Sequence, residues 1–259
     1  IGTLNTVIFC PEDLQLIKGT PSGRRRFLDM EISQTSATYY HQLMQYNRLL
    51  QQRNAILKEY RGKQNIPLEE WDLQLADMAS FIVKKRLESL KKINLLIDLM
   101  NRKLTGGLEN LTIGYEQPYM DNGSLEYTKE GFYERIKAAL PQDRHRMTTS
   151  VGPHRDDLRF FSDVMDLKKF GSQGQQRTSV LSLKLSELEF IKSEVGEYPV
   201  LLLDDVLSEL DESRRANLLQ FIHKRIQTFI TTTDIHDFKD LKSVQFISCE
   251  GGKVQYGQP

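Results

Sequence analysis

Two long stretches of the chain carry apolar residues at alternating steps of four and three, the spacing of a helical seam. The first runs from residue 24 to about 61, with an interruption expected around 33–36, and the second runs from about 68 to 104. The seam positions, broken once by Arg53, are Tyr39, Leu43, Tyr46, Leu50, Leu57, Trp71, Leu75, Met78, Ile82, Leu90, Ile93, Ile97, Met100 and Leu104. With a turn at 62–67, the pattern predicts an antiparallel helical hairpin with arms roughly 40–55 Å long at ~1.5 Å per residue.

The seam lasts only a few heptads, which favours a compact hairpin over an extended coiled-coil arm. A helical subdomain packed on a sheet is the alternative interpretation. Elsewhere, helices are expected at 11–14, 125–140, where Pro141 closes the helix, and 212–222. Residues 19–23 are expected to form a loop.

The remaining apolar segments are short and typical of strands. They lie at 3–9, 109–115, 158–161, 199–203 and 227–231, with hairpins at 160–167 and 244–256. The run at 199–203 is continuously apolar, which suits a strand buried on both faces of a mostly parallel sheet. Alternation of such strands with helices predicts an α/β fold.

Two carboxylates, Asp204 and Asp205, follow that apolar run directly. Open α/β sheets place their chemistry at this end of a strand. One carboxylate can hold Mg²⁺, usually through water, and a neighbour can orient or deprotonate an attacking water. Taken alone, the pair fits two acids in a surface turn equally well.

A polar turn upstream favours the catalytic interpretation. Residues 172–175 read Ser-Gln-Gly-Gln and open a helix. Backbone amides at a helix start, with a glycine that permits close approach, form an anion site. The Ser-Glu-Leu-Asp segment at 208–211 is a further polar element close to the aspartate pair.

The charge is balanced, with 35 Lys and Arg against 35 Asp and Glu. That argues against a wholly basic nucleic-acid binder, so any DNA contact must come from a local cluster. The densest cluster is Arg24, Arg25 and Arg26. A solvated loop, helix capping and nucleotide contacts are the other interpretations of this triplet.

The composition, 39% hydrophobic and 27% charged, is that of an ordinary soluble protein. No apolar run approaches the ~20 residues of a membrane span, and no signal-peptide pattern is present. Cys10 and Cys249 lie far apart, which suggests reduced thiols in a cytosolic protein. His154 beside Asp156 falls short of a metal-ligand set.

SQGQQ at 172–176, then a helix, LLLDD at 201–205 and SELD at 208–211 follow the order of signature motif, Walker B motif and D-loop. That order resembles the ABC-type ATPases of the SMC class. The longer segments FGSQGQQR, LLLDDVLSELD, VGPHRDDL and FCPEDLQLIKGTPSGRRRFLD resemble the RecF family within that class. The resemblance covers about residues 1 to 235.

The resemblance implies an ABC-type ATPase second half, a parallel-rich sheet with flanking helices, carrying an inserted antiparallel helical hairpin subdomain. Residues 1–14 would end the first ATPase lobe, 15–106 would form the hairpin, and 107–259 would form the C-terminal half with the motifs.

The resemblance also implies roles for single residues. Asp204 would hold Mg²⁺ and Asp205 would sit beside the attacking water. ATP would be shared between two copies of the chain. The residues expected to bind nucleotide, across the dimer or along its seam, are Ser172, Gln173, Gly174, Gln175, Ser208, Asp211 and Thr233. Many ABC ATPases have a histidine where Thr233 falls, so slow hydrolysis is expected.

At the level of the whole protein, the resemblance implies a cytoplasmic, ATP-driven clamp that dimerises and acts in DNA replication and in recombinational repair of DNA damage, within the SOS response. It would bind double-stranded DNA and single-strand/double-strand junctions, and load recombinase together with RecR and RecO.

No G-x-x-x-x-G-K-[ST] phosphate-binding loop occurs in the sequence. The chain is therefore interpreted as the hairpin plus the second half of the ATPase, inactive alone. The alternative is a non-catalytic fragment that docks DNA or partner proteins and binds nucleotide only when the missing lobe is supplied.

Overall fold

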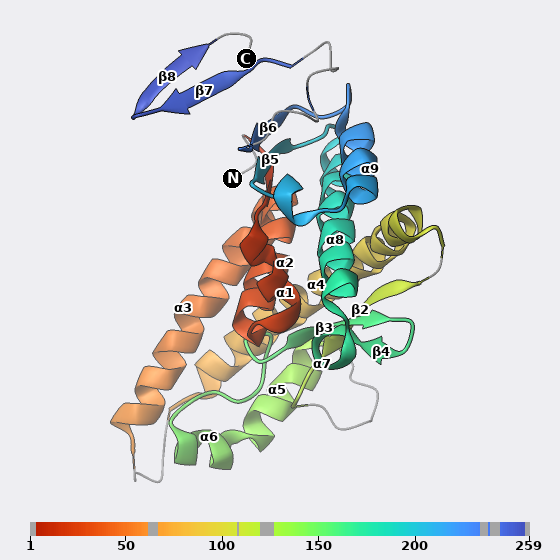
Figure 1. Ribbon diagram of the computed structural model, residues 1–259. Coiled ribbons are helices and arrows are strands. Elements are labelled where there is room, and N and C mark those ends of the chain that lie inside the picture. Colours follow the sequence, from red (N-terminus) through yellow and green to blue (C-terminus); the bar gives the residue numbers. More distant parts are fainter. Residues whose placement is uncertain are drawn as a thin grey trace.

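The computed structural model describes residues 4–61, 67–107, 109–119, 127–233, 238 and 244–256. Figure 1 shows an α/β molecule in which a small parallel sheet, an antiparallel sheet and long helices pack side by side. The expected fold class is confirmed at this level. The expected turn at 62–67 lies almost entirely outside the described residues.

The parallel sheet consists of β1 (Thr6–Phe9), β5 (Val200–Asp204) and β6 (Thr228–Thr231), in the order β1-β5-β6. Both pairs are parallel, and Leu203 is paired with Phe9 on one side and with Ile230 on the other. The strands at 3–9, 199–203 and 227–231 were all predicted from their apolar runs.

Burial of this sheet differs between its two faces. Val7, Leu201 and Leu203 are buried, and helix α8 (Gln173–Val195) packs against β1. Ile8 and Phe229 point the other way and are 52% and 54% exposed. The prediction that 199–203 is buried on both faces is met on one face only, because Val200 and Leu202 on the other face of β5 are half-buried in the part of the chain that the structure describes.

The second sheet is antiparallel, in the order β2-β3-β4, as the predicted hairpin at 160–167 requires. It contains β2 (Leu111–Glu116), β3 (Asp157–Ser162) and β4 (Met165–Asp166). The expected hairpin near the chain end is formed by β7 (Ile247–Glu250) and β8 (Lys253–Tyr256).

Three helices make up the helical subdomain, α2 (Pro21–Thr35), α3 (Ala37–Glu59) and α4 (Glu69–Thr105). The predicted interruption falls at Ser36, whose side chain caps α3 by accepting from the Tyr39 amide at 3.2 Å. The predicted loop at 19–23 is wrong in its second half. Thr20 caps α2 and Pro21 occupies its first turn, where a missing N–H costs nothing.

Helix α4 contacts α3, α8, β2 and α5 (Lys129–Ala138), so the helical subdomain is a compact unit and not a free arm. Most predicted seam residues are buried, among them Tyr46, Leu75, Ile82 and Ile97. Arg53, which breaks the apolar seam, is 0% exposed and is discussed below.

The remaining helical elements are short except for α8. They are η1 (Pro11–Leu14), α1 (Gln15–Lys18), α5 (Lys129–Ala138), α6 (Leu140–Arg146), α7 (Leu167–Phe170), η2 (Leu207–Glu209) and α9 (Glu212–Ile222). Pro141 does not close the predicted helix at 125–140, because it lies in the first turn of α6, where proline is tolerated.

Candidate functional site

Helix α8 begins with a reciprocal cap. The Gln175 amide donates to Ser172 Oγ at 3.2 Å, and the Ser172 amide donates to Gln175 Oε1 at 3.0 Å. Gln175 also donates through Nε2 to Glu109 at 2.9 Å. By helix geometry the amides of Gln173 and Gly174 have no intrahelical acceptor. This exposed tip therefore offers two amide donors and the positive end of a helix of 23 residues.

Two glycines near this tip differ in whether the fold leaves space for a side chain at their positions. A Cβ at Gly171 would lie 2.7 Å from the carbonyl oxygen of Leu167, so the chain itself requires glycine there. A Cβ at Gly174 would meet only Ser172 Oγ, at 4.0 Å. The chain has room for a side chain at Gly174, and its absence leaves the helix tip open to something outside the chain.

The two aspartates at the end of β5 are exposed and are held by one residue of the next strand. Thr231 Oγ1 donates to Asp204 Oδ1 at 2.7 Å and accepts from the Asp205 amide at 3.0 Å. Asp205 has φ of 51°, a left-handed conformation that aspartate tolerates better than most residues. Thr231 was not singled out from the sequence. The only available signal was its place at the end of the adjacent strand.

Three other residues assigned to the nucleotide follow β5 or β6: Ser208 and Asp211 come shortly after the aspartates in sequence, and Thr233 comes two residues after β6. Ser208 is exposed in η2 and its hydroxyl donates to the Asp205 carbonyl at 2.8 Å. Asp211 caps α9 by accepting from the Arg214 amide at 2.9 Å, and its carboxylate pairs with the Arg214 guanidinium. Thr233 is exposed just beyond β6.

These predicted residues fall into two groups within one chain. In Figure 1, α8 begins beside α7 and the antiparallel sheet, whereas β5 lies beside β6 and α9 toward the other end of α8. The partners agree with this arrangement, because Gln175 bonds Glu109 whereas Asp204 bonds Thr231.

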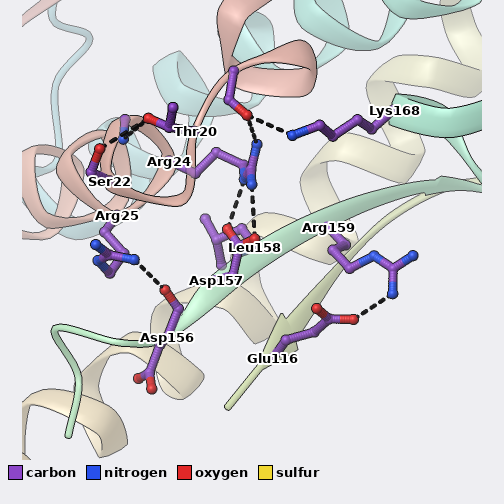
Figure 2. Close-up of polar contacts among 12 residues, drawn as sticks. Thr20, Ser22, Arg24, Arg25, Glu116, Asp156, Asp157, Leu158, Arg159 and Lys168 are labelled. Carbon is purple, nitrogen blue, oxygen red and sulfur yellow. Dashed lines mark hydrogen bonds and ion pairs between the residues drawn. The ribbon is translucent and has the colours of Figure 1, made fainter. Parts of the chain in front are cut away.

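The three consecutive arginines have three different environments, and Figure 2 shows those of Arg24 and Arg25. Arg24 is 3% exposed and forms a two-pronged ion pair with Asp157, with Nε and Nη2 each 2.8 Å from a carboxylate oxygen. Arg25 is half-buried and donates to the Asp156 carbonyl at 2.7 Å. Arg26 is exposed. They lie on α2 and not in a solvated loop, and the Arg24 charge is already paired within the chain.

The segment at 152–156 is tied to the helical subdomain through a second buried arginine. Arg86 on α4 is 2% exposed, pairs with Asp29 at 2.9 Å and donates to the Pro153 carbonyl at 2.7 Å. Asp156 lies 3.5 Å from the same guanidinium. Sequence reasoning missed Arg86. The signal for it was a charged residue among apolar neighbours on a long helix.

His154 is the structural link between this segment and α3. Tyr46 Oη donates to His154 Nδ1 at 2.6 Å, because Nε2 already donates to the Thr149 carbonyl at 3.0 Å. A Cβ at Gly152, which has φ of +132°, would lie 2.4 Å from Tyr46 Oη. Burial lowers the pKa of His154 from 6.5 to about 4, so the ring is neutral at pH 7.

A further charged cluster, which was not recognised from the sequence, lies where α8 packs against η1 and α2. Lys184 Nζ is 3.2 Å from Asp13 and 3.4 Å from Glu187. Burial raises the pKa of Glu31, the nearby acid on α2, to about 7. The cluster joins α8 to η1 and α2 inside the protein, so its role is structural.

Among the described residues, no group of three or more His, Cys, Asp and Glu side chains is placed to hold a metal ion. Across the same ranges, every helix is too short or too polar to cross a bilayer.

A scan against protein-family models finds no match. Curated relatives are found, each a DNA replication and repair protein RecF. The protein from Alkaliphilus oremlandii is 50% identical over 244 residues, covering 93% of this chain and 66% of the relative. The protein from Halalkalibacterium halodurans is 45% identical over 261 residues, covering 98% and 70%. The chain thus spans about two thirds of the length of these relatives.

Solved structures agree. Two structures of the recombination mediator protein RecF in the RecFOR pathway, with ATP and with ATPrS, superpose with TM-scores of 0.89 and 0.87 at 36% identity. They cover 99% and 98% of this chain, which spans 68% of each. The fold and the order of its motifs define the second half of an ABC-type ATPase. Within that class, the chain belongs to the RecF family.

Proposed function

We propose that this chain supplies the signature helix, the Walker B aspartates and the D-loop of an ATP-dependent clamp that acts on DNA in replication and recombinational repair. The observation that carries the proposal is the open helix tip at Gly174, where the chain has room for a side chain and carries none. The aspartate edge lies elsewhere on the same chain. Two separated half-sites of this kind suit a nucleotide held between two copies.

In such a pair, the α8 tip of one copy faces the triphosphate held at the aspartate edge of the other. The free amides of Gln173 and Gly174 and the Ser172 hydroxyl bind γ-phosphate oxygens, assisted by the positive helix end. Ser208 and Asp211 lie along the seam. The phosphate-binding loop comes from a part of the protein outside this chain.

The aspartate edge fits the metal that ATPases of this class use. Asp204 is exposed, and Thr231 takes up only one of its carboxylate oxygens, so the other is available to a hard cation or its water shell. A bound Mg²⁺ would neutralise charge on the β- and γ-phosphates. Asp205, held by Thr231 and Ser208, orients the attacking water and accepts its proton.

DNA contacts in this proposal go mainly to phosphates. Arg25 and Arg26 remain candidates for them, whereas the Arg24 guanidinium is already bound to Asp157. Double-stranded DNA, single-strand/double-strand junctions, RecR with RecO, and recombinase loading follow from family membership and belong to the proposal. So do a cytoplasmic location and slow hydrolysis with Thr233 in place of a histidine.

The test is Asp205→Asn in the full-length protein. Loss of the proton acceptor should lower ATP turnover by about 10²–10⁴-fold, while ATP-dependent dimerisation, followed by light scattering, persists. The matched control is Asp163→Asn, because Asp163 is also exposed with φ of 51° but lies in the β3–β4 turn. Turnover by Asp205→Asn at the control rate would contradict the assignment.

The alternative, a docking fragment without its own nucleotide site, is favoured by the exposed apolar face of the parallel sheet at Ile8 and Phe229. Titrating labelled ATP into the 259-residue chain and into the full-length protein separates the two. Binding and turnover only in the full-length protein supports the clamp. Partner or DNA binding with no turnover in either supports the docking fragment.

A further inference from the structure

A cavity of about 580 Å³ lies between α2, α3 and the segment around His154. Its volume falls within the range of sites that hold small ligands, roughly 300–1,000 Å³. Its lining is mostly apolar and includes three arginines, Arg25, Arg26 and Arg86. The other lining residues that matter most for the argument are Met30, Tyr40 and Leu43.

The charge around this cavity is uneven. Arg86 is buried and is neutralised by Asp29, whose oxygens lie 2.9 Å from its Nε and Nη2. His154 is neutral at pH 7. Arg25 contacts a main-chain carbonyl, and within the described part of the chain neither Arg25 nor Arg26 has a carboxylate at ion-pair distance. The cavity lining, with three arginines and one aspartate, therefore carries excess positive charge.

Arg25 is the more buried of the two cations. Burial, followed by the nearby charge of Arg86, lowers the pKa of its guanidinium, and the carboxylates of Asp156, Asp157 and Asp29 offset this only in part. A bound anion would act in the same direction as these carboxylates. Ser22, Arg25 and Arg26 also lie in the first two turns of α2, whose positive end adds to the same field. The neighbouring arginines Arg24 and Arg86 form direct ion pairs with Asp157 and Asp29, whereas Arg25 and Arg26 have no such ion pair within the described residues and can contact an anion directly.

The apolar side chains of the lining suit a planar ring of low polarity. Tyr40 and Leu43 come from α3, and Met30 comes from α2. Met30 is 52% exposed although it borders a cavity with apolar walls. Aromatic rings and thioethers stack well on planar rings, and the Asn47 amide at the rim can hydrogen-bond to an edge.

We propose that this cavity receives one nucleotide of a single strand of DNA, with its phosphate on Arg25 and Arg26 and its base between Met30, Tyr40 and Leu43. The inference rests on the proposed DNA-binding function and specifies which part of the nucleic acid the chain reads. A base inside a duplex is stacked and paired and cannot enter, whereas an unpaired base enters at little cost. The same surface would then distinguish a single-stranded segment from a duplex.

The experiment uses full-length protein and two labelled probes, an oligothymidine and a blunt duplex, followed by fluorescence anisotropy. Arg26→Ala and Met30→Ala change the cavity. Their matched controls are Arg48→Ala, an exposed arginine on α3 outside the lining, and Met44→Ala, which is also 52% exposed.

Met30→Ala should weaken oligothymidine binding about tenfold, within the range measured for a base-stacking side chain. Arg26→Ala should weaken it and reduce the slope of log K against log salt by about 0.7, the value for one single-strand phosphate contact. Met30→Ala should leave duplex binding within about twofold of wild type, and both control variants should keep oligothymidine binding within the same limit.

Equal oligothymidine affinity in cavity and control variants would overturn the proposal, even if duplex binding remains and the clamp function stands. Loss of duplex binding alone, with oligothymidine binding unchanged, would also overturn it. A third result is decisive against it. If an oligoglutamate peptide competes with the oligothymidine and deoxythymidine monophosphate does not, the cavity binds an acidic protein segment.

Discussion

The polar residues of this chain fall into two contrasting regions. Inside the helical subdomain, Arg53 and Arg86 are 0% and 2% exposed, and their guanidiniums bond two or more acceptors each. At the start of α8, the chain leaves open space beside Gly174. At the end of β5, Asp204 is exposed and its carboxylate accepts a hydrogen bond from Thr231. Sequence motifs occur in both regions, and the segment 151–158 belongs to the region of the buried arginines.

The contrast shows how a buried charge differs in purpose from an exposed one. A charge taken out of water must be paired, and its pairs then fix how helices and loops meet. Arg53 joins α3 to α4 through Asp72 at 2.6 Å and to α6 through Asp143 at 2.7 Å. An exposed carboxylate with few partners stabilises little and remains available to a ligand. Motif residues therefore have to be sorted by burial before they are assigned chemistry.

The largest effect is expected from breaking a buried pair. Arg86→Met should reduce the free energy of unfolding by about 3–5 kcal/mol, because Asp29 and buried Asp156 lose their cation. Urea denaturation followed by circular dichroism measures the change. The adjacent Lys85→Met is the control. Its partner Glu88 is 62% exposed, so a change of at most about 1 kcal/mol is expected there. Equal changes in the free energy of unfolding of the two variants would contradict the distinction between buried and exposed ion pairs.

An intermediate effect is expected from pH. The folded-state pKa of His154 is lowered from 6.5 to about 4 by burial. Its contribution to stability is therefore present above about pH 6.5 and is lost as the pH falls through about 4. His154→Gln should flatten the loss of stability across that window, which corresponds to on the order of 3 kcal/mol. Exposed His145→Gln should leave the curve unchanged.

The smallest effect on stability, and an opposite one on function, is expected at the α8 tip. Gly174→Ala should stabilise the fold by up to about 1 kcal/mol, because the chain leaves space for a Cβ. The same methyl group would block close approach to the tip and weaken ATP-driven dimerisation of the full-length protein. Gly23→Ala, also in a first helical turn with open space, is the control and should leave dimerisation intact.

Most of the fold was predictable from local pattern. The two long helices, the break at Ser36, the three parallel strands and α9 follow from periodicity, caps and apolar runs, which depend on neighbours in sequence. Two helix boundaries were misplaced, at Pro21 and Pro141, because proline suits a helix start as well as a helix end. The predicted burial of 199–203 on both faces failed because burial depends on which elements cover the sheet, and an apolar run does not determine this.

The candidate site was predictable only in part. The exposed tips could be recognised because their residues are consecutive and resemble a known family. Thr231, Arg86 and Tyr46 could not, because each acts on a residue at least 26 positions away along the chain. The paired state of Arg24 was equally hidden, since Asp157 is 133 residues away. Burial and long-range pairing decide these roles, and neither can be derived from local composition.

The Thr231 hydroxyl has a single proton, and that proton points to Asp204 while the oxygen receives the amide of Asp205. The Asp204 carboxylate and the Asp205 backbone amide are consequently linked through one hydroxyl group on the neighbouring strand. A cation that draws electron density from the Asp204 carboxylate weakens the hydrogen bond from this hydroxyl, and the change reaches the Asp205 backbone without direct contact between the two acids. Thr231→Val would remove this link, whereas Thr231→Ser would keep it.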